Sequence, residues 1–228
     1  MGVKQMTKLG MITIGQAPRH DMASVIDKYI DGRSELVQVG VLDGLTKESI
    51  EEQLSPNSGD YILTTRLING DSVVMSREKM QSVMQEKVYQ LEKMGINQIL
   101  LLCTGEFPGL QTNTSYLIEP DQIIPAAVKA ILGQRRLGVI IPLAEQVDSI
   151  MNKFSKFGMC PHITIASPYK NDLKNYEKAA NELKDKVDLI LLDCMAYSEQ
   201  SREIVSQLTG LPVIVSNVIM AKLVSEMI

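Results

Sequence analysis

Short apolar runs, separated by segments of helical period, recur along the whole chain and limit what it can fold into. Several runs are continuously apolar rather than alternating, which is typical of parallel strands covered by helices on both faces. The sequence therefore predicts an α/β protein built of βαβ units. Strands are expected at residues 9–15, 36–42, 96–103, 136–142, 163–167, 187–194 and 211–217.

Two of the intervening segments have a clear helical period. Apolar side chains recur every three or four positions in residues 77–95, where Gly95 supplies a stop, and again in residues 171–187. The side chains expected on the buried faces are Met80, Met84, Val88, Leu91 and Met94 in the first helix and Leu173, Tyr176, Ala180, Leu183 and Val187 in the second.

One stretch interrupts the alternation of strands and helices. In YILTTRLINGDSVVMS, residues 61–76, the pair Asn69-Gly70 is typical of the turn of a β-hairpin. The sequence therefore predicts a small antiparallel hairpin appended to the first half of the chain.

The chain also consists of two similar series, each of which leads to a strongly apolar strand that ends in cysteine. These are Cys103 in LLLCTGEF and Cys194 in ILLDCMAY. Ligands of open α/β sheets bind at the carboxyl ends of the strands, and a helix that starts there favours a thiolate. The alternative, that each cysteine is a small buried hydrophobe, stays open.

Two cysteines that face one ligand suggest acid/base chemistry at carbon. One thiolate takes a proton from a carbon next to a carboxylate, and the other thiol delivers a proton from the opposite face, so no metal or organic cofactor is needed. The carbanion then needs hydrogen-bond donors aimed at the carboxylate. Candidates for these donors are Thr104, Gly105, Asn113 and Thr114.

Further candidates for substrate binding lie in TIGQAPRHD, which forms a strand-to-helix turn at the same edge. Gln16 belongs to this turn, and Arg19 is suited to bidentate binding of a carboxylate. Asp21 is the expected N-cap of the helix that follows. An exposed arginine at the start of a helix is the alternative for Arg19.

Three residues elsewhere complete the set of binding candidates. Arg66 lies inside a predicted strand, and Ser216 and Asn217 follow the last one. The alternative for Arg66 is an ordinary strand arginine that faces outward. The alternative for Ser216 and Asn217 is that they cap the last helix.

Composition argues against several classes of function. The 228 residues carry a net charge of −4 and no Trp, which disfavours a nucleic-acid partner. Three irregularly spaced cysteines do not make a disulfide framework, the polar start of the chain lacks a leader, and no apolar run approaches ~18 residues. We therefore expect a reduced, cytoplasmic protein that does not enter membranes.

Other kinds of site lack support in the sequence. Cys160 and His162 have no further cluster to complete a zinc site, and His20 is the only other histidine, which leaves little for a serine hydrolase. Neither GxGxxG nor GxxxxGK[ST] is present, so no motif for nucleotide binding exists. No metal and no cofactor are expected.

Five segments taken together resemble the AroM family of small bacterial proteins: TIGQAPRHD, ILTTRLINGD, LLLCTGEFP, LLDCMAY and PVIVSNVIMAKL. The resemblance runs from Gly10 to the C-terminus. The family in turn resembles a distant branch of the aspartate/glutamate/hydantoin racemase superfamily, whose relatives often dimerise, so a homodimer is an expectation from the resemblance.

The superfamily resemblance implies two similar parallel-sheet lobes related by a pseudo-twofold axis, with the active site in the cleft between them. Lobe one is expected to comprise residues 1–118 and 215–228, with the last helix packed on it, and lobe two residues 119–214. One cysteine from each lobe faces the substrate in that superfamily. Cys103 and Cys194 stand where those two cysteines are expected, and Thr104 follows as a binding neighbour.

Two departures change the expected substrate. The turn after the first strand is GQAPR instead of an Asp-Ser-Gly type turn, and Cys194 is followed by Met195, Ala196 and Tyr197 instead of Thr-His. Groups that recognise the ammonium of an amino acid are thus absent or replaced. The resemblance therefore favours another small carboxylate, held by Arg19 and Arg66.

The leading hypothesis is a cofactor-independent racemase or isomerase of a small carboxylic acid that uses Cys103 and Cys194. Two alternatives stay open. One is a non-catalytic carboxylate-binding protein on the same fold, and the other is a single-cysteine isomerase or decarboxylase in which the second cysteine is structural.

Overall fold

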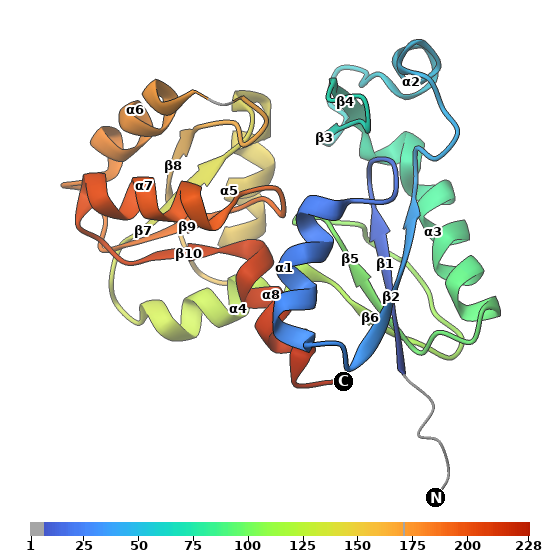
Figure 1. Cartoon of the computed structure of the whole chain (residues 1–228). Coiled ribbons are helices and arrows are strands. Elements are labelled where there is room, and N and C mark those ends of the chain that lie inside the picture. The colour runs from blue at the N-terminus through green and yellow to red at the C-terminus, as the bar shows by residue number, and fades with distance from the viewer. Residues whose placement is uncertain (1–6, 171) are drawn as a thin grey trace, which may run out of the picture.

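Figure 1 shows two α/β lobes, each with its own sheet, and helices packed between the two sheets. The computed structural model describes residues 7–170 and 172–228. Residues 1–6, on which the expectation of a chain without a leader partly rests, lie outside the described residues, as does residue 171 at the start of one predicted helical segment.

Each lobe contains a four-stranded sheet in which every neighbouring pair is parallel. The first sheet has the order β2-β1-β5-β6 and the second, read in the matching direction, β8-β7-β9-β10. The bounds are β1 (Thr7–Thr13), β2 (Ser34–Gly40), β5 (Gln98–Leu101), β6 (Tyr116–Ile118), β7 (Leu137–Ile141), β8 (His162–Ile165), β9 (Leu189–Leu192) and β10 (Val213–Val215). The predicted pair of similar parallel sheets is confirmed.

The register makes β5 and β9 equivalent strands. Beyond β5, the N–H of Leu102 donates to the carbonyl of Ile12 at 2.8 Å, and beyond β9 the N–H of Asp193 donates to the carbonyl of Ile140 at 3.0 Å. Both acceptors lie on the central strand of their sheet, β1 or β7. The next residue in each lobe is a cysteine, so the two cysteines occupy matching positions.

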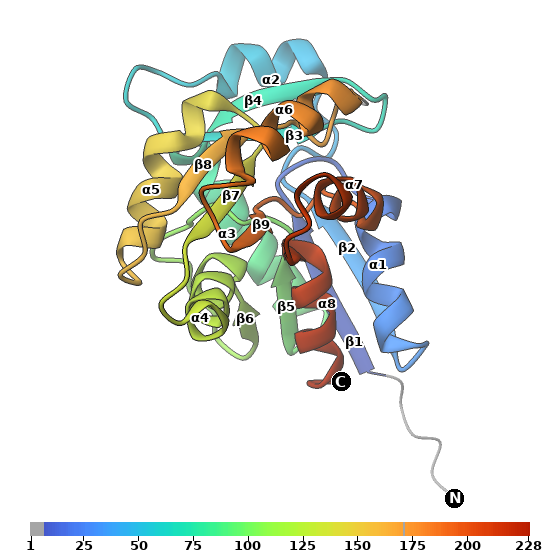
Figure 2. The same cartoon turned by 90° about the vertical axis from the view of Figure 1, so that its left-hand side faces the viewer.

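The helices form an inner layer and two outer layers (Figures 1 and 2). Side chains of α1, α4, α5 and α8 build the core between the sheets, α3 covers the outer face of the first sheet, and α6 and α7 cover that of the second. The bounds are α1 (His20–Ile30), α2 (Lys47–Leu54), α3 (Arg77–Lys93), α4 (Pro120–Leu132), α5 (Val147–Ser155), α6 (Leu173–Leu183), α7 (Glu199–Thr209) and α8 (Ser216–Ser225). The last helix, α8, packs against α1 and α4.

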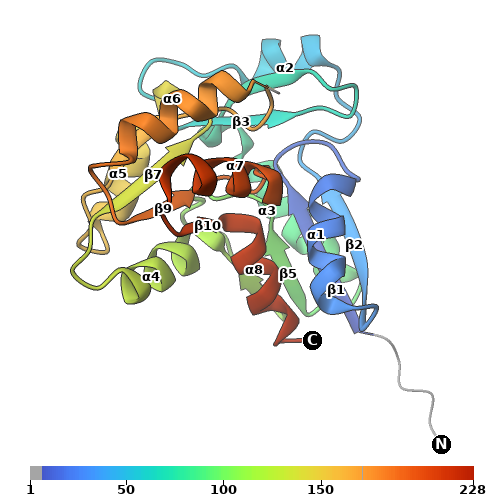
Figure 3. The ribbon, with the colours of Figure 1, turned by 60° about the vertical axis from the view of Figure 1, so that its left-hand side comes forward.

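The predicted hairpin is present in lobe one and consists of β3 (Ile62–Arg66) and β4 (Ser72–Ser76). Gly70 in its turn has φ +94°, a left-handed conformation that costs glycine little. Figure 3 shows the hairpin beyond the end of the first sheet, next to lobe two. There β3 contacts the short 3₁₀ helix η1 (Ala144–Gln146) of lobe two.

Three details of the sequence interpretation are wrong. Met94 is 51% exposed and Leu173 is 59% exposed, although both were expected in the core. Met94 follows the last residue of α3 and Leu173 is the first residue of α6, so neither has a helical turn beyond it to cover the side chain. The edge strand β6 was not expected, because its three residues are too few to show a pattern.

Among the described residues, no helix has both the length and the apolar character needed to cross a membrane.

The contact of α8 with the inner core gives a first prediction. Met220 is completely buried, whereas Leu223 on the same helix is exposed. Met220→Ala removes buried methylene groups and is expected to lower the free energy of unfolding by about 2–5 kcal/mol. Leu223→Ala, the matched control, is expected to change it by about 0.5 kcal/mol or less. Urea denaturation of both variants provides the measurement, and equal losses would contradict the packing described here.

Candidate active site

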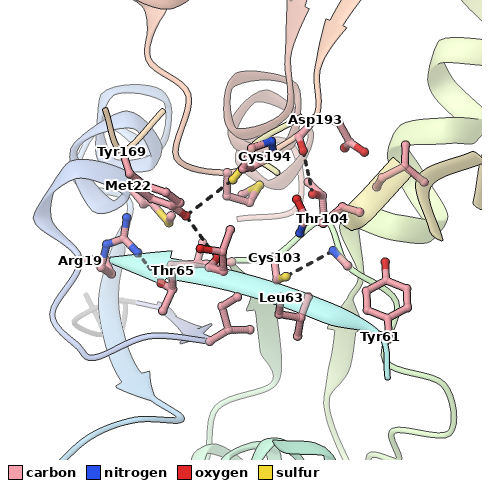
Figure 4. Close-up of a pocket in the computed structure, with 18 residues that line it drawn as sticks. Arg19, Met22, Tyr61, Leu63, Thr65, Cys103, Thr104, Tyr169, Asp193 and Cys194 are labelled. Carbon is pink, nitrogen blue, oxygen red and sulfur yellow. Dashed lines mark hydrogen bonds between the residues drawn. The ribbon is translucent and has the colours of Figure 1, made fainter. Parts of the chain in front are cut away.

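A small, partly open cavity lies between the lobes at the carboxyl ends of the strands of both sheets (Figure 4). Its volume is about 30 Å³, which leaves room for a few water molecules. Cys103, two residues beyond the end of β5, and Cys194, two residues beyond the end of β9, both line it. The equivalent strand ends therefore bring their cysteines to one cavity.

Cys103 is buried, and its sulfur accepts a hydrogen bond from the backbone two residues later. The N–H of Gly105 donates to the Cys103 Sγ at 3.3 Å. A Cβ atom at Gly105 would lie 2.7 Å from the Cδ2 of Leu63, so a larger residue here would require the Leu63 side chain to shift. Burial raises the pKa of the Cys103 thiol to about 12, and the Gly105 N–H offsets only part of that effect.

Cys194 keeps partial solvent exposure and has a richer set of polar neighbours. The hydroxyl of Tyr169 lies 3.8 Å from its Sγ. The enclosed surroundings raise the pKa of Cys194 and the charge of Asp193 adds to this effect, whereas the N–H of Ala196, the Tyr169 hydroxyl and the charge of Arg19 act in the opposite direction. More groups can therefore stabilise a thiolate at Cys194 than at Cys103.

Each cysteine was expected just before a loop or the start of a helix, and the part of this expectation that relied on a helix N-terminus to favour a thiolate is wrong. Cys103 is followed by a loop, and α7 begins only at Glu199, five residues after Cys194. Removal from water therefore dominates, and it favours the neutral thiol.

Arg19 lines the cavity and is only 7% exposed. Its Nε and Nη2 donate to the two carboxylate oxygens of Asp21 at 2.9 and 2.6 Å, and its Nη1 donates to the hydroxyl of Thr65 at 3.4 Å. Asp21 is not the N-cap that the sequence predicted, because the cap position belongs to Arg19 itself and has no side-chain hydrogen bond. Nη1 is the guanidinium nitrogen that makes no hydrogen bond to Asp21.

Thr104 and Gly105 also line the cavity, directly after Cys103. The Thr104 hydroxyl donates to the backbone carbonyl of Asp193 at 3.3 Å, which links the two cysteine segments across the lobes.

Gln16 and Arg66 lie outside the residues that line the cavity, and both make contacts with the hairpin or its surroundings. The Gln16 side chain donates to the carbonyl of Leu45 at 2.9 Å and accepts from the N–H of Ile68 at 3.0 Å. Arg66 donates to the carbonyl of Tyr169 and lies over its ring, 5.7 Å from the centroid. The two side chains thus hold the hairpin in place in this state of the protein.

Asn113 and Thr114 lie away from the cavity and bind Glu92 of α3 instead. Their N–H groups both donate to Glu92 Oε1 at 2.8 Å, and the N–H of Ser115 does so at 3.0 Å. Although desolvation acts the other way, these donors lower the pKa of Glu92 to about 2. The hydroxyl-rich segment therefore fastens its loop to α3.

Ser216 and Asn217 are buried beneath the Cys194 loop, outside the lining of the cavity. Ser216 donates to the carbonyl of Leu192 at 2.9 Å, and the Asn217 amide donates to the carbonyls of Met195 and Tyr197 at 3.0 and 2.7 Å. Both side chains therefore hold the loop that carries Cys194.

A buried ion pair that the sequence analysis did not identify lies beneath both cysteine segments. Lys153 on α5 is 1% exposed, and its Nζ donates to Asp193 Oδ2 at 2.5 Å and to the carbonyl of Thr104 at 3.0 Å. A signal was present, because Lys153 lies with Ile150 and Phe154 on the apolar face of α5. A lysine on such a face requires a buried partner.

Side chains of lobe two close the cavity against the hairpin. Gln146 Nε2 donates to the carbonyl of Ile62 at 3.1 Å, and the Tyr169 hydroxyl donates to the carbonyl of Thr64 at 3.4 Å. Gln146 and Tyr169 both line the cavity, although Gln146 ends the 3₁₀ helix η1, Tyr169 lies in a connecting segment, and neither belongs to a motif. These contacts narrow the cavity on the side of the hairpin.

Within residues 7–170 and 172–228, no group of three or more histidine, cysteine, aspartate or glutamate side chains is arranged to hold a metal ion.

Comparison with protein families supplies the observation that decides the relationship. The profile described as AroM protein matches residues 9–228, which is nearly the whole chain. The chain belongs to the AroM family. Comparison with curated proteins gives no significant match.

Solved structures similar to this AroM-family chain have the same two-lobe fold. Unliganded arylmalonate decarboxylase is 14% identical with a TM-score of 0.61, and the match covers 97% of this chain and 92% of that one. Aspartate racemase from Picrophilus torridus is 14% identical, with a TM-score of 0.59 and coverages of 96% and 94%. The maleate isomerase from Pseudomonas putida S16 is 13% identical, with a TM-score of 0.62 and coverages of 94% and 90%. The racemase-like fold predicted from the resemblance is confirmed.

The raised thiol pKa values of this AroM-family chain give a second prediction. At about pH 7 Cys103 is protonated, so iodoacetamide is expected to alkylate exposed Cys160 faster than Cys103. Because the thiolate fraction rises tenfold per pH unit below the pKa, the Cys103 rate is expected to rise about tenfold from about pH 8 to about pH 9. Mass spectrometry of each cysteine peptide gives the rates. Preferential labelling of Cys103 at neutral pH would contradict the burial argument.

Proposed function

We propose that this AroM-family chain is a cofactor-independent enzyme that transfers a proton at a carbon next to the carboxylate of a small acid. In this proposal Cys103 and Cys194 are the acid/base pair. The observation that carries it is the presence of two cysteines, from matching positions of two equivalent strands, in the lining of one cavity. A substrate carbon between them would be open to proton transfer from both sides.

The proposed step exchanges one proton for another. A thiolate formed at one cysteine removes a proton from the substrate carbon and becomes a thiol, while the electron pair moves into the substrate carboxylate. The thiol of the other cysteine then donates its proton to the opposite face of the carbon and becomes a thiolate. The product is the racemised or isomerised acid, and the total charge of the enzyme is unchanged.

The charges at the cavity support an acid without an amine as the substrate. Arg19 is the buried cation that can reach a carboxylate through its Nη1, next to Thr65. The carboxylate in the cavity lining is Asp193, and Lys153 already holds it. A substrate ammonium would therefore have no free carboxylate to bind among the lining residues.

Proton exchange in D₂O tests the proposal. The protein is incubated with a panel of small carboxylic acids, amino acids and hydantoins, and loss of the carbon-bound proton is followed by NMR. Exchange is expected with a carboxylic acid that lacks an amine. Cys103→Ser and Cys194→Ser are each expected to slow it about 10²–10⁴-fold, because a hydroxyl is a far weaker acid than a thiol. Cys160→Ser is the matched control and is expected to keep the full rate. Full activity in both cavity variants would refute the cysteine pair.

The role of Arg19 is tested by a pair of substitutions. Arg19→Lys removes the planar fork and is expected to raise KM for the exchanged acid about tenfold or more, through loss of a charge-assisted hydrogen bond. Asp21→Asn weakens the competing internal ion pair and is expected to lower KM. KM values from the exchange assay give the comparison. An unchanged KM in Arg19→Lys would exclude Arg19 as the carboxylate ligand.

A second candidate is a single-cysteine isomerase or decarboxylase that uses Cys194. It is favoured by the unequal surroundings of the thiols, since the Tyr169 hydroxyl and the charge of Arg19 are among the main groups that assist ionisation at Cys194, whereas the Gly105 N–H and the charge of Lys153 do so at Cys103. In the exchange assay this candidate predicts loss of activity in Cys194→Ser but retention in Cys103→Ser. Ligand-induced NMR shifts without exchange across the panel would instead favour a carboxylate-binding protein.

A further inference from the structure

The peptide that joins Thr104 to Gly105 has polar partners on both of its sides. Its carbonyl oxygen accepts a hydrogen bond from the Lys153 ammonium at 3.0 Å, and its N–H donates to the Cys103 Sγ at 3.3 Å. In a planar trans peptide the C=O and N–H point in opposite directions. Lys153 and Cys103 therefore stand at the two ends of one peptide dipole.

The direction of this dipole matters for the chemistry at Cys103. The N–H end is positive and faces the sulfur, and the cation at the C=O end polarises the peptide further in the same sense. Negative charge on the sulfur is stabilised by this arrangement, whereas a neutral thiol gains little from it.

The orientation of the ion pair adds to the effect. Lys153 points to the Cys103 segment, whereas its partner Asp193 precedes Cys194 directly in the sequence. In accordance with this, the charge of Lys153 acts to lower the pKa of Cys103, and the charge of Asp193 acts to raise the pKa of Cys194. One buried pair thus acts in opposite directions on the two thiols.

We propose that Lys153 is a positioning residue for Cys103, which fixes the Thr104–Gly105 peptide with its N–H on the sulfur and polarises that peptide in favour of the thiolate. This inference rests on the proposed function in so far as Cys103 is one of the reacting groups. Burial still outweighs this assistance, so Lys153 reduces the free-energy cost of ionising Cys103 but does not remove it.

Charged and titratable groups from several elements surround Cys103, and the experiment leaves all but one pair of them unchanged. They are Lys153 on α5, its partner Asp193 and Cys194 after β9, Asp121 on α4, Tyr61 before β3 and Tyr169 after β8.

The test compares alkylation rates of the cysteines in the double variant Lys153→Met/Asp193→Asn and in the unchanged protein. Removal of both charges avoids a buried unpaired ion, and methionine keeps the length of the apolar stem. Iodoacetamide is the probe, at one fixed pH of about 9, and mass spectrometry reads each cysteine peptide. The alkylation rate of exposed Cys160 controls for the activity of the reagent, and the rate of Cys194 controls for access of the reagent to the cavity.

The Cys103 rate is expected to fall about tenfold in the double variant, which corresponds to a rise of about one pKa unit. The Cys194 rate is expected to stay the same or rise, because the negative charge of Asp193 is gone. A merely structural role of Lys153 predicts the opposite for Cys103, since a loosened cavity admits the reagent faster to both thiols. An unchanged or increased Cys103 rate would overturn the inference.

A second variant keeps the test decisive if the double variant does not fold. Lys153→Arg retains a positive donor and is expected to keep the Cys103 rate within about threefold, whereas a tenfold loss there would show that the charge is not the determinant. Because alkylation needs no substrate, its outcome is independent of the exchange assay. Suppose that Cys103→Ser loses proton exchange but the double variant alkylates Cys103 at the unchanged rate. This result would leave the proposed function intact and refute the role of Lys153.

Discussion

The buried ion pair of Lys153 and Asp193 is the interaction on which the geometry of the cavity depends. It belongs to lobe two, yet Lys153 also binds the Thr104 carbonyl of lobe one, and the Thr104 hydroxyl returns a hydrogen bond to Asp193. The two cysteine segments are thereby joined through a single buried charge pair. Loss of one partner would leave an uncompensated charge in the core, at a cost of about 3–5 kcal/mol.

A symmetric fold here produces an asymmetric site. Equal strand order and equal register deliver one cysteine from each lobe, but the groups around each sulfur come from loops and helices that differ between the lobes. Cys103 receives a backbone N–H supported by Lys153, whereas Cys194 has Tyr169 and Arg19 close by. The two thiols therefore differ in the groups that would assist their ionisation.

The small volume of the cavity connects the hairpin to function. Gln146 and Tyr169 of lobe two satisfy backbone carbonyls of β3, and Arg66 of the hairpin binds the Tyr169 segment in return. These few polar contacts border a cavity of about 30 Å³. They limit the access of water to the thiols, and a low dielectric there strengthens charge interactions.

The α/β class, the hairpin and the position of both cysteines at strand ends could be predicted from the sequence, because burial periodicity and turn residues are local properties of the chain. Arg19, Thr104 and Gly105 were also predicted at the correct edge. The neighbours of each group follow from the packing of the two lobes and could not be predicted in this way. Asn113 and Thr114 bind a helix carboxylate, Ser216 and Asn217 support a loop, and Lys153 reaches across to the other lobe. Burial and the pairing of charges depend on residues distant in the chain, and these decide whether a strand-end cysteine is a thiol or a thiolate.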